Sequence, residues 1–130
     1  MLMHSIRMDL DAHKRKYVRD QVSAKNNSSI TLALINPCFA IVFYYRLYSH
    51  LYKSKNKFTR SISILLYYLI NRLYGCDIHP AATIGVPLKV GHCSDIVIGP
   101  LAVVGENCYI FNGVTIGNKY VGEMGDMPII

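Results

Sequence analysis

The sequence predicts an α + β fold in which an N-terminal helical region, residues 1–75, is followed by a short parallel β-helix, residues 76–130. Three observations lead to this prediction. Aliphatic residues recur at every sixth position between 98 and 116, the residues before 75 carry apolar side chains at helical spacing, and Gly75 offers a helix stop between the two patterns. The chain of 130 residues is long enough for one domain, or for one domain with a helical appendage.

Three helical segments are expected before Gly75. The first covers 5–23, where four apolar residues form a stripe among charged ones: Ile6, Leu10, Tyr17 and Val22. The second segment, 30–52, is interrupted by Asn36-Pro37, which ends or kinks one helix and begins another. Its apolar run from 30 to 45 has 16 residues, whereas a membrane span needs about 20, so we favour a helix buried among other helices.

The third helix is predicted over 59–74. It is apolar around most of its circumference, so it has to be covered by other helices, by another subunit or by lipid headgroups. A basic loop, 53–57, precedes it.

The repeat places an aliphatic residue at Ile98, Val104, Ile110 and Ile116, and small residues stand two positions before the last three: Ala102, Cys108 and Val114. Both positions are expected to face inward in a prism with one flat side per six residues. Two extra residues between Val90 and Ile98 predict a corner loop at 92–95. After Gly117 the aliphatic position returns only at Ile130, which fits two repeats plus two residues, or one repeat plus an eight-residue external loop.

About two coils plus this loop are therefore expected, and no element outside the repeat pattern closes the last coil. The open edge indicates either a chain truncated at its C-terminus or an edge covered by another chain.

Charge is divided unevenly along the chain, whose net charge is +6. Residues 1–76 carry twelve Lys and Arg against three acidic residues, and 77–130 carry two against five. The basic part either contacts an anionic surface or is the solvated face of a helix. The four cysteines have no metal-ligand spacing, so we expect free thiols, no metal and a reducing compartment. An N-terminus with Asp9 and Asp11 differs from a secretory signal, which favours the cytoplasm.

A resemblance to a known family rests on the segment 77–85, Asp-Ile-His-Pro-Ala-Ala-Thr-Ile-Gly, followed by His92 and by Ile-Val-Ile-Gly at 96–99. With Tyr-Arg-Leu at 45–47 and His50, this resembles the serine acetyltransferase family over roughly residues 35–130. The resemblance implies a left-handed β-helix, acetyl-CoA bound between neighbouring subunits of a trimer, and a histidine base oriented by an aspartate. His92 takes the base role by this resemblance, and Asp77 the orienting role.

The chemistry of these two residue types supports the same roles. Acetyl transfer from a thioester to a hydroxyl requires removal of the hydroxyl proton, and imidazole titrates near neutral pH. A carboxylate on the other ring nitrogen fixes the tautomer. Asp77 and His92 are fifteen residues apart, close to one coil of about eighteen, so they can meet on adjacent coils. A solvated loop histidine is the alternative, but the corner loop and the matching Asp77 favour catalysis.

The chain departs from the family at two places. Serine acetyltransferases commonly have an Asp before the catalytic His and an Arg-His-Pro after the external loop, whereas this chain has Gly91 and Asp126-Met127-Pro128. A zwitterionic acceptor loses its charge partners there, which disfavours L-serine. The chain resembles more closely the sugar O-acetyltransferases of exopolysaccharide and capsule clusters, including the colanic-acid type. A sugar hydroxyl is expected to be held by Asn112, Asn118 or backbone groups, and His79 is either a further substrate residue or a turn residue.

Five residues look like the family's acetyl-CoA-contacting edge: Gly113, Thr115, Gly117, Asn118 and Lys119. Glycine at β-helix corners is an equally good explanation for two of them. The main prediction is an acetyl-CoA-dependent O-acetyltransferase acting on a sugar hydroxyl in polysaccharide biosynthesis. Serine O-acetyltransferase of cysteine biosynthesis and an inactive assembly subunit are the alternatives.

The expected partners are further copies of the chain, as a trimer or a dimer of trimers, and a sugar acceptor. Peripheral contact with the inner face of a membrane is a further option, and no nucleic acid is expected.

Overall fold

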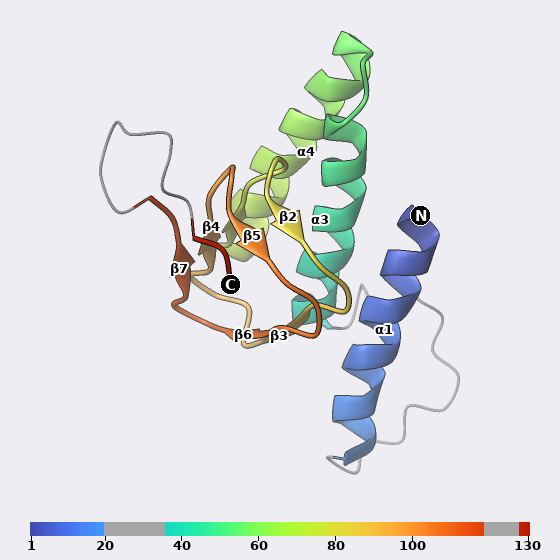
Figure 1. The fold of residues 1–130 in the computed structure, drawn as a ribbon, viewed down its shortest axis with the longest axis vertical. Coiled ribbons are helices and arrows are strands. Elements are labelled where there is room, and N and C mark those ends of the chain that lie inside the picture. Colours follow the sequence, from blue (N-terminus) through green and yellow to red (C-terminus); the bar gives the residue numbers. More distant parts are fainter. Residues whose placement is uncertain (20–35, 119–127) are drawn as a thin grey trace.

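The computed structural model describes residues 1–19, 36–118 and 128–130. Within these residues, three helices come first: α1 (Leu2–Arg19), α3 (Pro37–Tyr52) and α4 (Lys57–Tyr74). Figure 1 shows α3 and α4 side by side as a hairpin, with α1 alongside α3. Ile6 and Leu10 of the predicted first stripe are buried, whereas Tyr17, Val22 and the segment 30–35 fall outside the described side chains.

Asparagine caps set the starts of α3 and α4. Asn36 Oδ1 accepts hydrogen bonds from the backbone N–H groups of Cys38 and Phe39, at 3.0 and 3.3 Å. Asn56 Oδ1 accepts one from Phe58 at 2.9 Å, so α4 begins at Lys57, two residues before the predicted start. Gly75 ends α4 in the left-handed conformation, with φ of 63°. Within the described ranges, none of the helices combines the length and apolar character that a membrane crossing requires.

Seven short strands follow in the described part of the chain: β1 (Asp77–Ile78), β2 (Thr83–Ile84), β3 (Lys89–Gly91), β4 (Val97–Ile98), β5 (Val103–Val104), β6 (Tyr109–Phe111) and β7 (Thr115–Ile116). They pair in parallel as three separate sheets, β1-β4-β7, β2-β5 and β3-β6. Each strand pairs with the strand one coil later, and each sheet is one side of the prism beside the helices (Figure 1). This is the predicted β-helix.

The pairing register accounts for both irregularities of the repeat. Ile78 pairs with Ile98, twenty positions on, whereas Ile98 pairs with Ile116 after eighteen, so the first coil contains the two extra residues. Val103 pairs with Ile129 after twenty-six. The spacing of the second break therefore equals one repeat plus eight residues, and the chain returns to the β2-β5 side at Ile129.

One hydrophobic core joins α3 and α4 to the β-helix, while Ile6 and Leu10 of α1 pack with Phe39 in a separate cluster. The inward aliphatic residues are buried: Ile78, Ile84, Val90, Ile98, Val104, Ile110 and Ile116. Their cluster also includes Tyr45 and Tyr48 of α3 and Tyr67 and Ile70 of α4. Of the predicted inward small residues, Ala102 is fully buried, while Cys108 and Val114 are partly buried against the same cluster.

A buried ion pair fastens α1 and α3 to the first coil. Arg46 Nε lies 2.8 Å from Asp9 Oδ2, and Asp9 is fully buried. The same guanidinium donates to the carbonyls of Ile84 and Gly85, and the backbone N–H of Leu88 donates to Asp9 Oδ1 at 2.8 Å. Both the guanidinium and the carboxylate therefore also form hydrogen bonds with the backbone of the first coil. A buried ion pair needs such additional hydrogen bonds.

Candidate active site

Three successive corners of the chain lie on top of one another around the loop 92–95. The backbone N–H of Asp95 donates to the carbonyl of Gly75 at 3.0 Å, and the N–H of Gly113 donates to the carbonyl of Ser94 at 3.1 Å. The loop therefore lies between the end of α4 and the corner that leads into β7. In this way the structure brings the His92 loop together with Asn112 and Gly113 of the predicted acceptor and coenzyme residues.

His92 lies at the start of this loop in a conformation that side chains seldom adopt. Its φ is 59°, in the left-handed region that is uncommon for residues other than glycine. The carbonyl of His92 accepts a hydrogen bond from Ser94 at 3.1 Å, which closes a tight turn, and its side chain is exposed. Backbone strain of this kind occurs often at functional sites.

Asp77 is held by a tyrosine of α4. The Tyr67 hydroxyl donates to Asp77 Oδ1 at 2.5 Å. Burial, with the neighbouring Asp77 carboxylate, raises the pKa of Tyr67 to about 12, so the hydroxyl keeps its proton at neutral pH. In the described part of the chain, Asp77 Oδ2 accepts no hydrogen bond, and none joins Asp77 to His92. The pairing of Asp77 with His92 stays a prediction.

His79 lies between two tyrosine rings. Its ring centroid is 5.7 Å from that of Tyr67 and 6.1 Å from that of Tyr52. The backbone N–H of Ala81 donates to His79 Nδ1 at 3.1 Å, which is the contact expected of a turn histidine. Burial lowers the pKa of His79, and the nearby Asp77 carboxylate opposes that shift. A neutral His79 with its proton on Nε2 fits these contacts.

Gly91 is covered by two aromatic residues of the next coil. A Cβ atom at Gly91 would lie 2.7 Å from the Tyr109 hydroxyl and 3.0 Å from Phe111 Cε1. The two ring centroids are 4.4 Å apart, and the side chains are 43% and 47% exposed. Sequence reasoning missed this aromatic pair, although the alternation of β6 places Tyr109 and Phe111 on the same outer face.

The predicted coenzyme residues lie along the outer edge formed by β7 and the corner before it. Asn112, Thr115 and Asn118 are exposed there, and Lys119 lies outside the described residues. Gly113 has φ of 72°, so the corner itself favours glycine, and a Cβ there would meet no atom within 4 Å. Gly117 has an ordinary φ, so the corner explanation covers only one of the two glycines.

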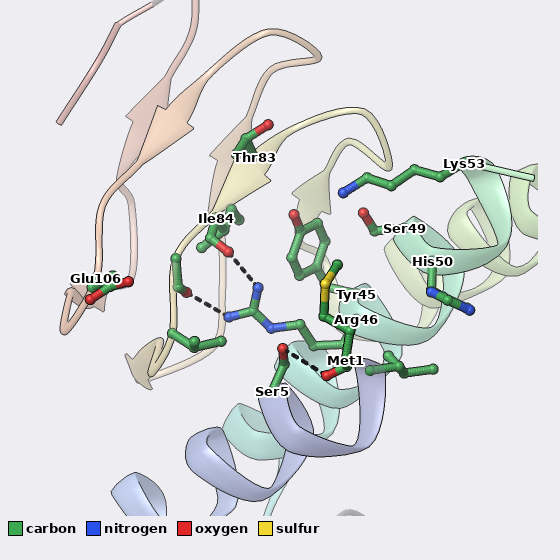
Figure 2. Close-up of a pocket in the computed structure, with 13 residues that line it drawn as sticks. Met1, Ser5, Tyr45, Arg46, Ser49, His50, Lys53, Thr83, Ile84 and Glu106 are labelled. Atoms are coloured by element: carbon green, nitrogen blue, oxygen red, sulfur yellow. Dashed lines mark hydrogen bonds between the residues drawn. The ribbon is translucent and has the colours of Figure 1, made fainter.

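A cleft of about 300 Å³ lies elsewhere, between the start of α1, α3 and β2. Figure 2 shows Lys53, Ser49 and Thr83 around it and the Arg46 guanidinium reaching the carbonyls of the first coil. None of the predicted catalytic, acceptor or coenzyme residues lines this cleft. The candidate site is instead an open corner of the β-helix. No cluster of metal-ligating side chains occurs within the described residues.

Comparison with known proteins identifies the family. No family model matches the chain. Serine acetyltransferase 4 of Arabidopsis thaliana is 33% identical over 116 residues, which cover 89% of this chain and 30% of the relative. The chain belongs to the serine acetyltransferase family. The solved Neisseria gonorrhoeae serine acetyltransferase in complex with serine matches at a TM-score of 0.72 and 29% identity, covering 93% of this chain and 47% of that one.

A third match is the serine acetyltransferase of Brucella abortus in complex with coenzyme A, with a TM-score of 0.71 and 29% identity over 93% of this chain. The predicted fold, a helical region followed by a left-handed β-helix, is confirmed by these structures. The chain spans about a third of the Arabidopsis relatives it matches and just under half of the solved chains.

The expectation of a sugar acceptor is wrong. The relatives are named serine acetyltransferases, and solved members of the same fold hold serine. The expectation rested partly on Gly91, where the family commonly has an Asp. Tyr109 and Phe111 lie over Gly91, so local packing is a second explanation for the glycine, and its presence does not by itself exclude serine. The second departure is Asp126-Met127-Pro128 in place of Arg-His-Pro, and its residues 126 and 127 lie outside the described residues.

Proposed function

We propose that this chain acts in acetyl transfer from acetyl-CoA to the hydroxyl of L-serine, with His92 as general base. The observation that carries the proposal is the pair of backbone hydrogen bonds that join the loop 92–95 to Gly75 on one side and to Gly113 on the other. The His92 loop thus lies between the start of the first coil, near Asp77, and the predicted coenzyme edge. Family membership supports it, because solved relatives hold serine or coenzyme A.

The reaction requires one proton relay. As the serine oxygen attacks the thioester carbonyl carbon, His92 accepts the hydroxyl proton, and the carbon–sulfur bond breaks. The coenzyme A thiolate then takes the proton from the imidazolium, which leaves O-acetylserine. Tyr67 occupies Asp77 Oδ1 and leaves Oδ2 for the second ring nitrogen of His92, where a carboxylate stabilises the imidazolium.

For the coenzyme, we assign the edge that contains Gly113, Thr115, Gly117, Asn118 and Lys119. The open space at Gly113 supports this assignment, since a ligand chain can approach the backbone closely there. An edge that is open on one side is completed by a neighbouring copy, so we propose a homo-oligomer, either a trimer or a dimer of trimers. All four cysteines are free, which suits a reducing, cytoplasmic compartment.

The acceptor is tested by measuring thiol release from acetyl-CoA with L-serine and with L-alanine. The two amino acids share the ammonium and carboxylate groups, but L-alanine lacks the attacking hydroxyl. We expect release above the blank with L-serine only. Equal release with both would show hydrolysis without acceptor, and no release together with no calorimetric binding of acetyl-CoA would contradict the proposal.

A further inference from the structure

The outward side of α4 carries an uninterrupted row of apolar side chains. Five residues at intervals of three or four positions form this row, which we call the outer strip: Phe58 (74% exposed), Ile62 (39%), Leu65 (70%), Leu69 (59%) and Leu73 (68%). Since successive helical residues are about 100° apart, the five lie within about 80° of the circumference. Ser63, Tyr67 and Ile70, which are buried, occupy the opposite side of the helix. The core already has its own face of α4, so the outer strip is not needed for folding.

Positive charge lies at both ends of the outer strip. Lys53, Lys55, Lys57 and Arg60 cluster at the loop between α3 and α4, where they line a shallow hollow with Tyr52. Arg72 lies at the other end of α4, and the sequence contains no Asp or Glu between residues 21 and 76. Within the described residues, the one ion pair of the hairpin joins Arg46 to Asp9 of α1. The loop cations, Lys53, Lys55 and Lys57, are therefore exposed and have no carboxylate partner among the described residues.

This charge pattern distinguishes between two possible occupants of the outer strip. If a second copy docked its α4 there, cations of one chain would face cations of the other, because neither helix offers an acidic residue at the rim. An anionic bilayer complements the rim, while its acyl region accepts the apolar residues. Tyr68, which is 63% exposed beside the strip, has the amphipathic ring that such an interface favours.

We propose that α4 docks in the plane of an anionic membrane surface, with the outer strip entering the boundary between headgroups and acyl chains and the loop cations binding the lipid phosphates. The helix lies on the bilayer and does not cross it. This docking is independent of the acetyl-transfer site, because no residue of the outer strip belongs to that site.

Co-sedimentation of the purified chain with vesicles tests the proposal. We expect binding to vesicles of phosphatidylcholine with phosphatidylglycerol, weak binding to phosphatidylcholine alone, and weaker binding as salt rises. The double variant Leu65→Ser/Leu69→Ser and the triple variant Lys53→Gln/Lys55→Gln/Lys57→Gln should each bind at least about tenfold more weakly. Leu101→Ser, which changes a leucine of similar exposure (53%) on the β-helix, is the matched control and should bind like the wild type.

Equal binding to both kinds of vesicle, or no binding to either, overturns the proposal. It is also overturned if Leu65→Ser/Leu69→Ser lowers the molar mass in light scattering and leaves vesicle binding unchanged, since a second copy would then be the occupant. Far-UV circular dichroism establishes that each variant folds. Should the leucine variant misfold, the lysine variant decides, because its exposed side chains contribute nothing to the core.

Discussion

Replacing Tyr67 by Phe isolates the hydrogen bond that holds Asp77. The change removes one hydroxyl from a buried ring and leaves its contacts with Tyr48 and His79 in place. A hydrogen bond to a charged group contributes about 1–2 kcal/mol when one side is partly solvated, as the half-buried Asp77 is. We therefore expect the free energy of unfolding to fall by about that amount and the melting temperature by about 3–8 °C.

Urea denaturation followed by circular dichroism measures the loss, with Tyr68→Phe as the control. Tyr68 is the next residue on the same helix, and its side chain is 63% exposed. Removing its hydroxyl should therefore change the free energy of unfolding by less than about 0.5 kcal/mol. Equal stability of the two variants would refute the reasoning. If Asp77 also orients His92, Tyr67→Phe makes the carboxylate more basic and moves the acid limb of the pH–rate profile to higher pH, an effect that a purely structural role would not produce.

Three further predictions concern the supports of the site. Gly85→Ala should destabilise the chain by about 1–3 kcal/mol in urea denaturation, because the new Cβ would lie 2.6 Å from backbone atoms of Gly105, whereas Gly117→Ala, whose nearest atom is 3.9 Å away, should change little. Asp9→Ala should cost about 3–5 kcal/mol, since it leaves Arg46 buried without its carboxylate, and the exposed Asp11→Ala serves as the control; similar losses would show that the ion pair is not a support. Burial and the neighbouring Cys38 raise the pKa of Cys93, so at pH 8 iodoacetamide should label Cys93 more slowly than Cys108, and the labelling rate of Cys93 should still rise well above pH 9. Peptide mass spectrometry measures both rates, and faster labelling of Cys93 would contradict this prediction.

The parts of the fold that repeat could be read from the sequence. The six-residue spacing predicted the coils, the two extra residues located the corner loop at 92–95, and Gly75 marked the end of α4 correctly. These features are local, because the β-helix repeats one short unit against its neighbours. Between Ile116 and Ile130, the sequence fits either two repeats plus two residues or one repeat plus eight. Only the pairing of Val103 with Ile129 in the structure distinguishes these two alternatives.

The supports of the site could not be predicted because they join residues far apart in the sequence. In the sequence, Asp9 indicates only that the N-terminus is not a secretory signal, whereas in the structure it is the buried partner of Arg46, thirty-seven positions away. In the sequence, Tyr67 is one residue of a largely apolar helix, and nothing in the pattern indicates that its hydroxyl reaches Asp77. The acceptor could not be predicted for a similar reason, since the aromatic rings that lie over position 91 come from the next coil, at Tyr109 and Phe111, and offer a second explanation for the glycine.

The most direct measurement compares product formation by the wild type and by His92→Asn. Asparagine keeps a polar side chain, tolerates the left-handed conformation that position 92 requires, and cannot act as a base at neutral pH. With acetyl-CoA and L-serine, mass spectrometry should detect O-acetylserine from the wild type and at least about a hundredfold less from the variant. An equal rate of product formation by both proteins would contradict the assignment of His92 as the base and, with it, the candidate active site.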